Sequence, residues 1–124
     1  IMCLIATREK DIVQVTFKDM VVYKVLTPGV FDNNYGTSPF LYKRYYFSHE
    51  YQAEFGLEHG YNYWHAKESW SVEQGLHAYR TLHNANRSGW TYTQVYKAII
   101  PACSAYILGQ KDIVSNRLIV IGPV

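Results

Sequence analysis

The sequence is poor in cysteine, proline and charge. Its 124 residues include 2 Cys and 4 Pro, and Asp, Glu, Lys and Arg together make up 18%. Cys3 and Cys103 lie far apart and match no metal-ligand spacing, so we expect two buried thiols in a reducing cytosol, with a disulfide possible but unsupported. The formal net charge of +2 is too small to indicate a long nucleic acid as partner.

Long apolar runs and catalytic signatures are also missing. No stretch of about 18 apolar residues is present, so we expect no membrane span. Residues 2–7 have no basic flank or cleavage site, and therefore do not read as a signal peptide. The sequence has no Walker A, GxGxxG or GxSxG motif. Three histidines and three glutamates lie close in sequence, but their spacing matches no known metal motif, so we expect neither a metal nor a cofactor: His49, Glu50, Glu54, Glu58, His59 and His65.

What the sequence has instead is apolar and aromatic residues. Apolar residues make up 48%, enough for a core, and the length suits a single domain over residues 1–124. Tyrosine is the unusual component, with 12 copies beside 5 Phe and 3 Trp. With so little charge available, tyrosine rings must cover part of the surface.

Short β-branched and aromatic runs separated by turn residues predict mostly strands. The first three, with tight connections between them, predict an antiparallel meander. Thr81 is a good N-cap for a short helix through Arg87 that ends at Ser88-Gly89, and residues 31–39 read as a long loop with a possible function. The expected strands cover residues 2–7, 12–17, 20–26, 40–46, 51–55, 61–65, 72–79, 91–100, 104–108 and 113–121. The fold class is therefore α+β, mostly antiparallel β-sheet with one or two short helices.

Arginine or lysine recurs beside aromatic rings. Arg80 follows Tyr79, and Arg87 lies three residues before Trp90. Guanidinium groups bind phosphates, and aromatic rings stack on bases, so these pairs are typical of sites for small phosphorylated nucleotides. If residues 112–117 are extended, Asp112 and Asn116 share one face and Arg117 points to the other. The candidate ligand-binding residues are His77, Tyr79, Arg80, Arg87, Trp90, Tyr106, Asp112, Asn116 and Arg117.

Two other interpretations stay open at this point. The tyrosines also suit a protein–protein interface, and a small β-rich domain often covers its exposed edges by forming oligomers. A catalytic pair of Cys103 with His77 is conceivable, because such pairs are spatial and need not be close in sequence. A small nucleotide-processing enzyme and a structural or interaction protein of a phage are therefore the alternatives.

The last third of the chain carries a family resemblance. Its pattern is Gly75-Leu76-His77-Ala78-Tyr79-Arg80-Thr81, then residues 95–101, then Ser104-Ala105-Tyr106 and residues 112–120. With the opening Cys3-Leu4-Ile5-Ala6-Thr7 run, the chain resembles the first described family of phage anti-Thoeris sponges.

The resemblance implies a phage or prophage immune-evasion protein that is not an enzyme. Proteins of that family sequester cyclic ADP-ribose isomers, the signals made by bacterial TIR-domain enzymes, without degrading them, and so block Thoeris defence. It further implies a homo-oligomer, a dimer or higher, such as a hexamer, in the host bacterial cytoplasm. A separate site for cyclic oligonucleotides of CBASS defence is also implied.

Overall fold

The described part of the chain is built from antiparallel sheet and one short helix. The computed structural model describes residues 4–6, 13–30, 33–39, 42–62, 67–109 and 111–124. The helix is α1 (Leu82–Asn86). The strands are β1 (Leu4–Ala6), β2 (Val13–Val15), β3 (Met20–Pro28), β4 (Tyr35–Thr37), β5 (Arg44–Tyr46), β6 (Glu50–Gln52), β7 (Gly56–Asn62), β8 (Lys67–Gln74), β9 (Leu76–Tyr79), β10 (Gln94–Ile100), β11 (Ala105–Leu108), β12 (Asp112–Ser115) and β13 (Arg117–Pro123). The expected sheet-dominated fold is confirmed, with one helix in the described part of the chain.

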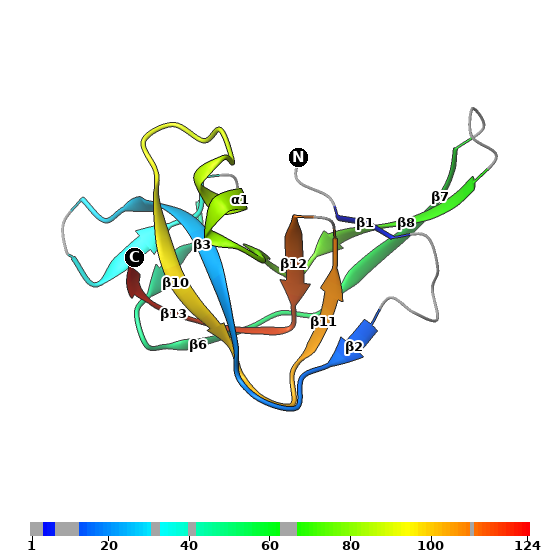
Figure 1. The fold of residues 1–124 in the computed structure, drawn as a ribbon, viewed down its shortest axis with the longest axis horizontal. Coiled ribbons are helices and arrows are strands. Elements are labelled where there is room, and N and C mark those ends of the chain that lie inside the picture. Colours follow the sequence, from blue (N-terminus) through cyan, green and yellow to red (C-terminus); the bar gives the residue numbers. More distant parts are fainter. Residues whose placement is uncertain (1–3, 7–12, 31–32, 40–41, 63–66, 110) are drawn as a thin grey trace.

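The described strands form two sheets. The larger has ten strands, eight of them in the order β2-β11-β12-β9-β3-β10-β13-β6, while β4 pairs with β3 and β5. The smaller has the order β1-β8-β7. In Figure 1, the β7–β8 hairpin reaches away from the larger sheet, whereas β3 and β10 run side by side through its middle.

One face of the larger sheet buries the main core. Residues at every second position along β3 and β10 turn to this face, because side chains alternate along a strand. Val22, Leu26, Tyr96, Ala98 and Ile100 are all nearly inaccessible to solvent. They pack with further buried side chains, namely Tyr45, Leu76, Ala78, Ile113, Leu118 and Val120.

A lysine lies within this core. Lys24 of β3 is buried, its Nζ donates to the carbonyl oxygen of His77, and it lies 4.9 Å from the centre of the Tyr45 ring. Burial, together with the nearby charge of Lys43, lowers the pKa of Lys24 to about 8. Burial also raises the pKa of Tyr45 to about 12. The core therefore holds its cation with a carbonyl and a ring.

The opposite face of the sheet carries α1. Val25 of β3 pairs with Val95 of β10, and Tyr23 of β3 pairs with Tyr79 of β9, so all four side chains turn to this face. The helix packs over β3, β10 and β9 (Figure 1). Its only buried residue is Ala85.

The helix begins and ends where local sequence predicts. Thr81 is extended, and its Oγ1 accepts a hydrogen bond from the backbone N–H of Asn84 at 3.2 Å. Arg87 is the C-cap, and Gly89 beyond it has a φ of +80°, a conformation that favours glycine. The predicted helix is thus confirmed.

The expected meander of the first three strands is wrong. β1 pairs with β8, β2 with β11, and β3 with β10, each partner lying far along the chain. Residues 31–39 are also not a plain loop, because β4 lies among them and pairs with β3. Local patterns predict that a segment is a strand, but the partner depends on which apolar faces fit together in the folded chain.

Two expected single strands are each divided in two. Gly75, with a φ of +137°, separates β8 from β9, and a Cβ at this position would lie 2.3 Å from Cγ1 of Val114. Asn116 separates β12 from β13. Each division sends the two halves to different partners, so they cannot be read as one alternating strand.

Cys103 is exposed, which corrects the expectation of a buried thiol. It lies in the turn between β10 and β11, with a φ of +63°, and its backbone N–H donates to the carbonyl of Thr16. Pro101 ends β10 as expected. Cys3 lies outside the described residues. Within the described part of the chain, no helix has the length and apolar character needed to cross a bilayer.

Candidate functional site

A cleft of about 860 Å³ lies beside α1, on the face of the sheet that the helix covers. The helix and the residues just after it supply one wall, and β9, β12 and the turn before β12 supply the other. Its lining residues combine two cations, an imidazole, a carboxylate, an amide, a hydroxyl and a phenol ring: Arg87, Lys111, His83, Asp112, Asn84, Ser88 and Tyr79.

The helical wall follows from helical periodicity. Arg87 lies four residues after His83 and three after Asn84, so the three side chains project from one side of the helix. The sheet wall follows from strand pairing, because Tyr79 of β9 is the cross-strand partner of Asp112 of β12. Side chains paired in this way turn to the same face, and both enter the cleft.

The cleft is electrostatically mixed. Partial burial raises the pKa of the Asp112 carboxyl above its ordinary value. Partial burial also raises the pKa of Tyr79, while a hydrogen bond with the Trp90 side chain acts in the opposite direction. The C-terminal end of α1 faces the cleft, and in a helix this short it carries only a weak partial negative charge. The affinity for an anion must therefore come from Arg87 and Lys111.

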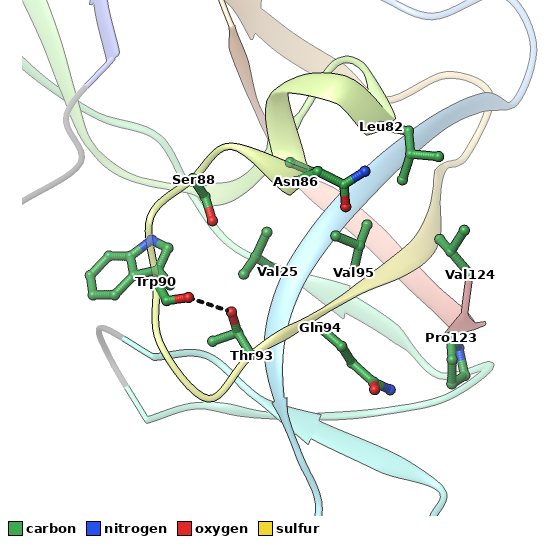
Figure 2. Close-up of a pocket in the computed structure, with 11 residues that line it drawn as sticks. Val25, Leu82, Asn86, Ser88, Trp90, Thr93, Gln94, Val95, Pro123 and Val124 are labelled. Carbon is green, nitrogen blue, oxygen red and sulfur yellow. Dashed lines mark hydrogen bonds between the residues drawn. The ribbon is translucent and has the colours of Figure 1, made fainter.

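A second pocket of about 390 Å³ lies on the other side of α1 (Figure 2). Its floor is the cross-strand pair Val25 and Val95, and its apolar walls come from Leu82 and Pro123. Trp90 lies at one end of the pocket and, through its hydrogen bond with Tyr79, connects the pocket to the cleft. Ser88 lines both cavities.

The nine residues proposed from the sequence do not form one site. Tyr79, Arg87 and Asp112 line the cleft, and Trp90 lines the adjoining pocket. Arg80 lies beside the cleft without lining it, and its Nη1 donates to the carbonyl of Gly109 at 3.3 Å.

His77 is two residues from Tyr79 on β9, yet it does not line the cleft. Its Nδ1 is buried and has no hydrogen-bond partner among the described residues. Burial, together with the charge of Lys24, lowers the pKa of His77 to about 4. Tyr106 on β11 donates its hydroxyl to Gln14 Oε1 at 2.7 Å. Both residues therefore lie apart from the cleft.

Asn116 and Arg117 belong to another part of the molecule. The Asn116 side chain accepts from the backbone N–H of Ala105 at 2.9 Å. Arg117 forms an ion pair of 2.6 Å with Glu50 and donates to the carbonyl of Ala102. The expected common face of Asp112 and Asn116 is wrong, because the chain leaves β12 at Asn116 and begins β13 with new partners.

The comparisons with known proteins return nothing for this chain. No family model, curated protein or solved structure matches it.

The catalytic pair of Cys103 with His77 does not form in the described part of the chain. Cys103 is in the β10–β11 turn beside Arg117, whereas His77 is on β9 beside Lys24, and no hydrogen bond joins them. In the same described residues, no three His, Cys, Asp or Glu side chains gather closely enough to hold a metal ion. Parts of the His49–His65 set lie outside these residues.

Sequence reasoning missed four cleft residues: His83, Asn84, Ser88 and Lys111. The predicted helix already contained the signal for His83 and Asn84, because Arg87 is spaced from both by one helical turn. Lys111 had no such signal. It joins the cleft only because β12 pairs with β9.

Proposed function

We propose that this chain binds a cyclic ADP-ribose-type signalling nucleotide and sequesters it without degrading it, thereby blocking Thoeris defence and, through a second site, CBASS defence. The observation that carries this proposal is the cleft of Tyr79, Arg87, Lys111 and Asp112. One cavity holds cations that can bind a pyrophosphate, an aromatic ring, and a carboxylate that can accept hydrogen bonds from ribose hydroxyls. The resemblance of the last third of the chain supports the same function.

The size and chemistry of the cleft suit such a ligand. Small-molecule sites commonly enclose about 300–1,000 Å³, and the cleft falls within this range. Arg87 can hold a phosphate through two parallel hydrogen bonds, and Lys111 adds a point charge. A sequestering protein must compete with the receptor for the signal. We therefore expect a nanomolar Kd, which corresponds to a binding free energy of about −12 kcal/mol.

Assembly into a dimer or larger homo-oligomer is part of the proposal. At the β2 end of the larger sheet, the described side chains of Val13 and Val15 are about half exposed, and the neighbouring Phe17 is 99% exposed. Exposed apolar side chains on an edge strand are commonly covered by a partner. Native mass spectrometry of the whole chain measures the number of subunits, and a monomer at all concentrations would contradict this part.

The deciding experiment follows the fate of the ligand. The protein is incubated with a glycocyclic ADP-ribose isomer, freed of unbound ligand, and heat-denatured, and the released molecules are identified by mass spectrometry. Recovery of intact ligand in proportion to protein supports sequestration. Recovery of a hydrolysed or isomerised product would instead support a nucleotide-processing enzyme, and no retained ligand would exclude the proposal.

A further inference from the structure

The second pocket, on the side of α1 away from the cleft, has an apolar floor and a polar rim. Val25 and Val95, paired across β3 and β10, make the floor, and Asn86 and Ser88 stand above them with their polar atoms turned inward (Figure 2). An apolar floor can pack against the face of a ring system, while polar groups at the rim are left to bind the edge of the ring.

Two rim residues keep their hydrogen-bonding groups available. Within the described chain, the Asn86 amide and the Ser88 hydroxyl make no side-chain hydrogen bond. By contrast, the Thr93 hydroxyl donates to the carbonyl of Trp90 at 3.0 Å, and the Gln94 amide donates to the Tyr96 hydroxyl at 2.9 Å. The free Asn86 amide offers a donor and an acceptor side by side.

That donor–acceptor pair has a natural complement in adenine. An asparagine amide can accept from the exocyclic amino group of adenine and donate to the adjacent ring nitrogen. The pocket volume of about 390 Å³ is large enough for a nucleobase with water around it. Trp90 lines this pocket and hydrogen-bonds to Tyr79, which lines the cleft.

We propose that the pocket of Val25, Val95, Asn86 and Ser88 is the base subsite for an adenine nucleotide, and that Asn86 determines the specificity for adenine. The inference rests on the proposed function, whose phosphate-binding half is the cleft with Arg87 and Lys111. A ligand that spans both cavities passes Ser88, which lines each of them. The base and the phosphates are then bound by different residues on either side of one short helix.

The division between cavities can be tested with half-ligands. Adenosine represents the base without phosphate, and inorganic pyrophosphate represents the phosphates without base. Asn86→Ala should weaken adenosine binding about 10- to 100-fold, in line with the discrimination given by a two-point amide contact, and leave pyrophosphate unchanged. Arg87→Ala should do the reverse. Asn33→Ala, which changes an exposed amide outside both cavities, is the matched control.

The binding position is read by NMR. Adenosine should shift the backbone amide resonances of Val25 and Val95 and the indole N–H of Trp90, identified from the spectrum of Trp90→Phe. Retained folding of Asn86→Ala is visible in the same spectra. Adenosine affinity unaffected by Asn86→Ala, or shifts outside the pocket, would overturn the base subsite. Retention of no cyclic ADP-ribose isomer by the unmodified chain would instead overturn the proposed function, so the two failures are distinct.

Discussion

Tyr79 and Asp112 are cross-strand partners on β9 and β12, and both side chains line the cleft beside α1. They are 33 positions apart in the numbering, so only the pairing of their strands brings a phenol ring and a carboxylate to one wall. Their proximity gives the cleft a ring and a hydrogen-bond acceptor on the wall opposite Arg87.

Asp112 should oppose anion binding while it contributes to ribose binding. Its partly buried carboxylate adds a negative charge to a cleft that is proposed to hold phosphates. We expect Asp112→Asn to tighten inorganic pyrophosphate binding about 3- to 10-fold at pH 7, because it removes this repulsion and keeps the shape. Isothermal titration calorimetry measures the pyrophosphate affinity of both proteins. Unchanged affinity would place the pyrophosphate away from Asp112.

Arg87 should supply much of the affinity for the intact ligand. We expect Arg87→Ala to weaken binding of a cyclic ADP-ribose isomer about 10- to 100-fold, the effect of losing a charge-assisted hydrogen bond to phosphate. Lys97→Ala removes an equal charge from an exposed position on β10 outside the cleft and serves as control. Equal affinities of the two variants would show that the ligand binds elsewhere.

The buried Lys24 should limit stability at neutral pH. Its pKa is lowered to about 8, so the folded state carries a penalty while the amine is charged, and the penalty is relieved as pH rises from 8 toward 10.5. We expect Lys24→Met to raise the free energy of unfolding by about 1–3 kcal/mol at pH 7.

The pH dependence separates this charge effect from better packing. The advantage of Lys24→Met should shrink as pH rises from 8 to 10 in urea denaturation series. Measurements stop at pH 10 because the pKa of Tyr45, raised to about 12, begins to lower stability above it. Lys97→Met, on the exposed side of β10, should show no such trend. An advantage of Lys24→Met that is constant with pH would contradict the assignment.

His77 should make the fold sensitive to acid. Its pKa is lowered to about 4, so the unfolded chain takes up a proton first, and stability falls as pH decreases from 6.5 toward 4. We expect His77→Gln to reduce the loss of unfolding free energy between pH 7 and pH 5 by about 1–2 kcal/mol. His83→Gln, at an exposed position on α1, is the control. Parallel pH profiles of the unfolding free energy for His77→Gln and the unmodified chain would rule out His77 as the source of the acid sensitivity.

Gly75 should be among the least replaceable residues. A Cβ there meets Cγ1 of Val114 at 2.3 Å, and the φ of +137° strains any other residue. We expect Gly75→Ala to cost at least about 3 kcal/mol of unfolding free energy. Gly122→Ala, where nothing lies within 4 Å and φ is not positive, should change stability by less than about 1 kcal/mol. Similar thermal midpoints for the two variants would show that Val114 can shift to admit the added Cβ.

The sequence predicted the local features of this chain well. Thr81 marks the start of the helix because a threonine side chain accepts a hydrogen bond from the first helical turn, and Pro101 ends β10 because proline lacks an N–H. Most of the expected strands begin and end within a few residues of the observed ones. These features depend on neighbouring residues alone, and neighbouring residues are what a sequence displays.

The tertiary structure decided which residues share a cavity. The nine residues chosen from rings and cations are divided among the cleft, the pocket and more distant positions, because β12 pairs with β9 while β13 pairs with β10 and β6. Lys111 enters the cleft, and Arg117 instead meets Glu50. Alternation along a strand determines which side chains share a face, but strand partners are selected by long-range packing, and the break at Asn116 cannot be read from alternation.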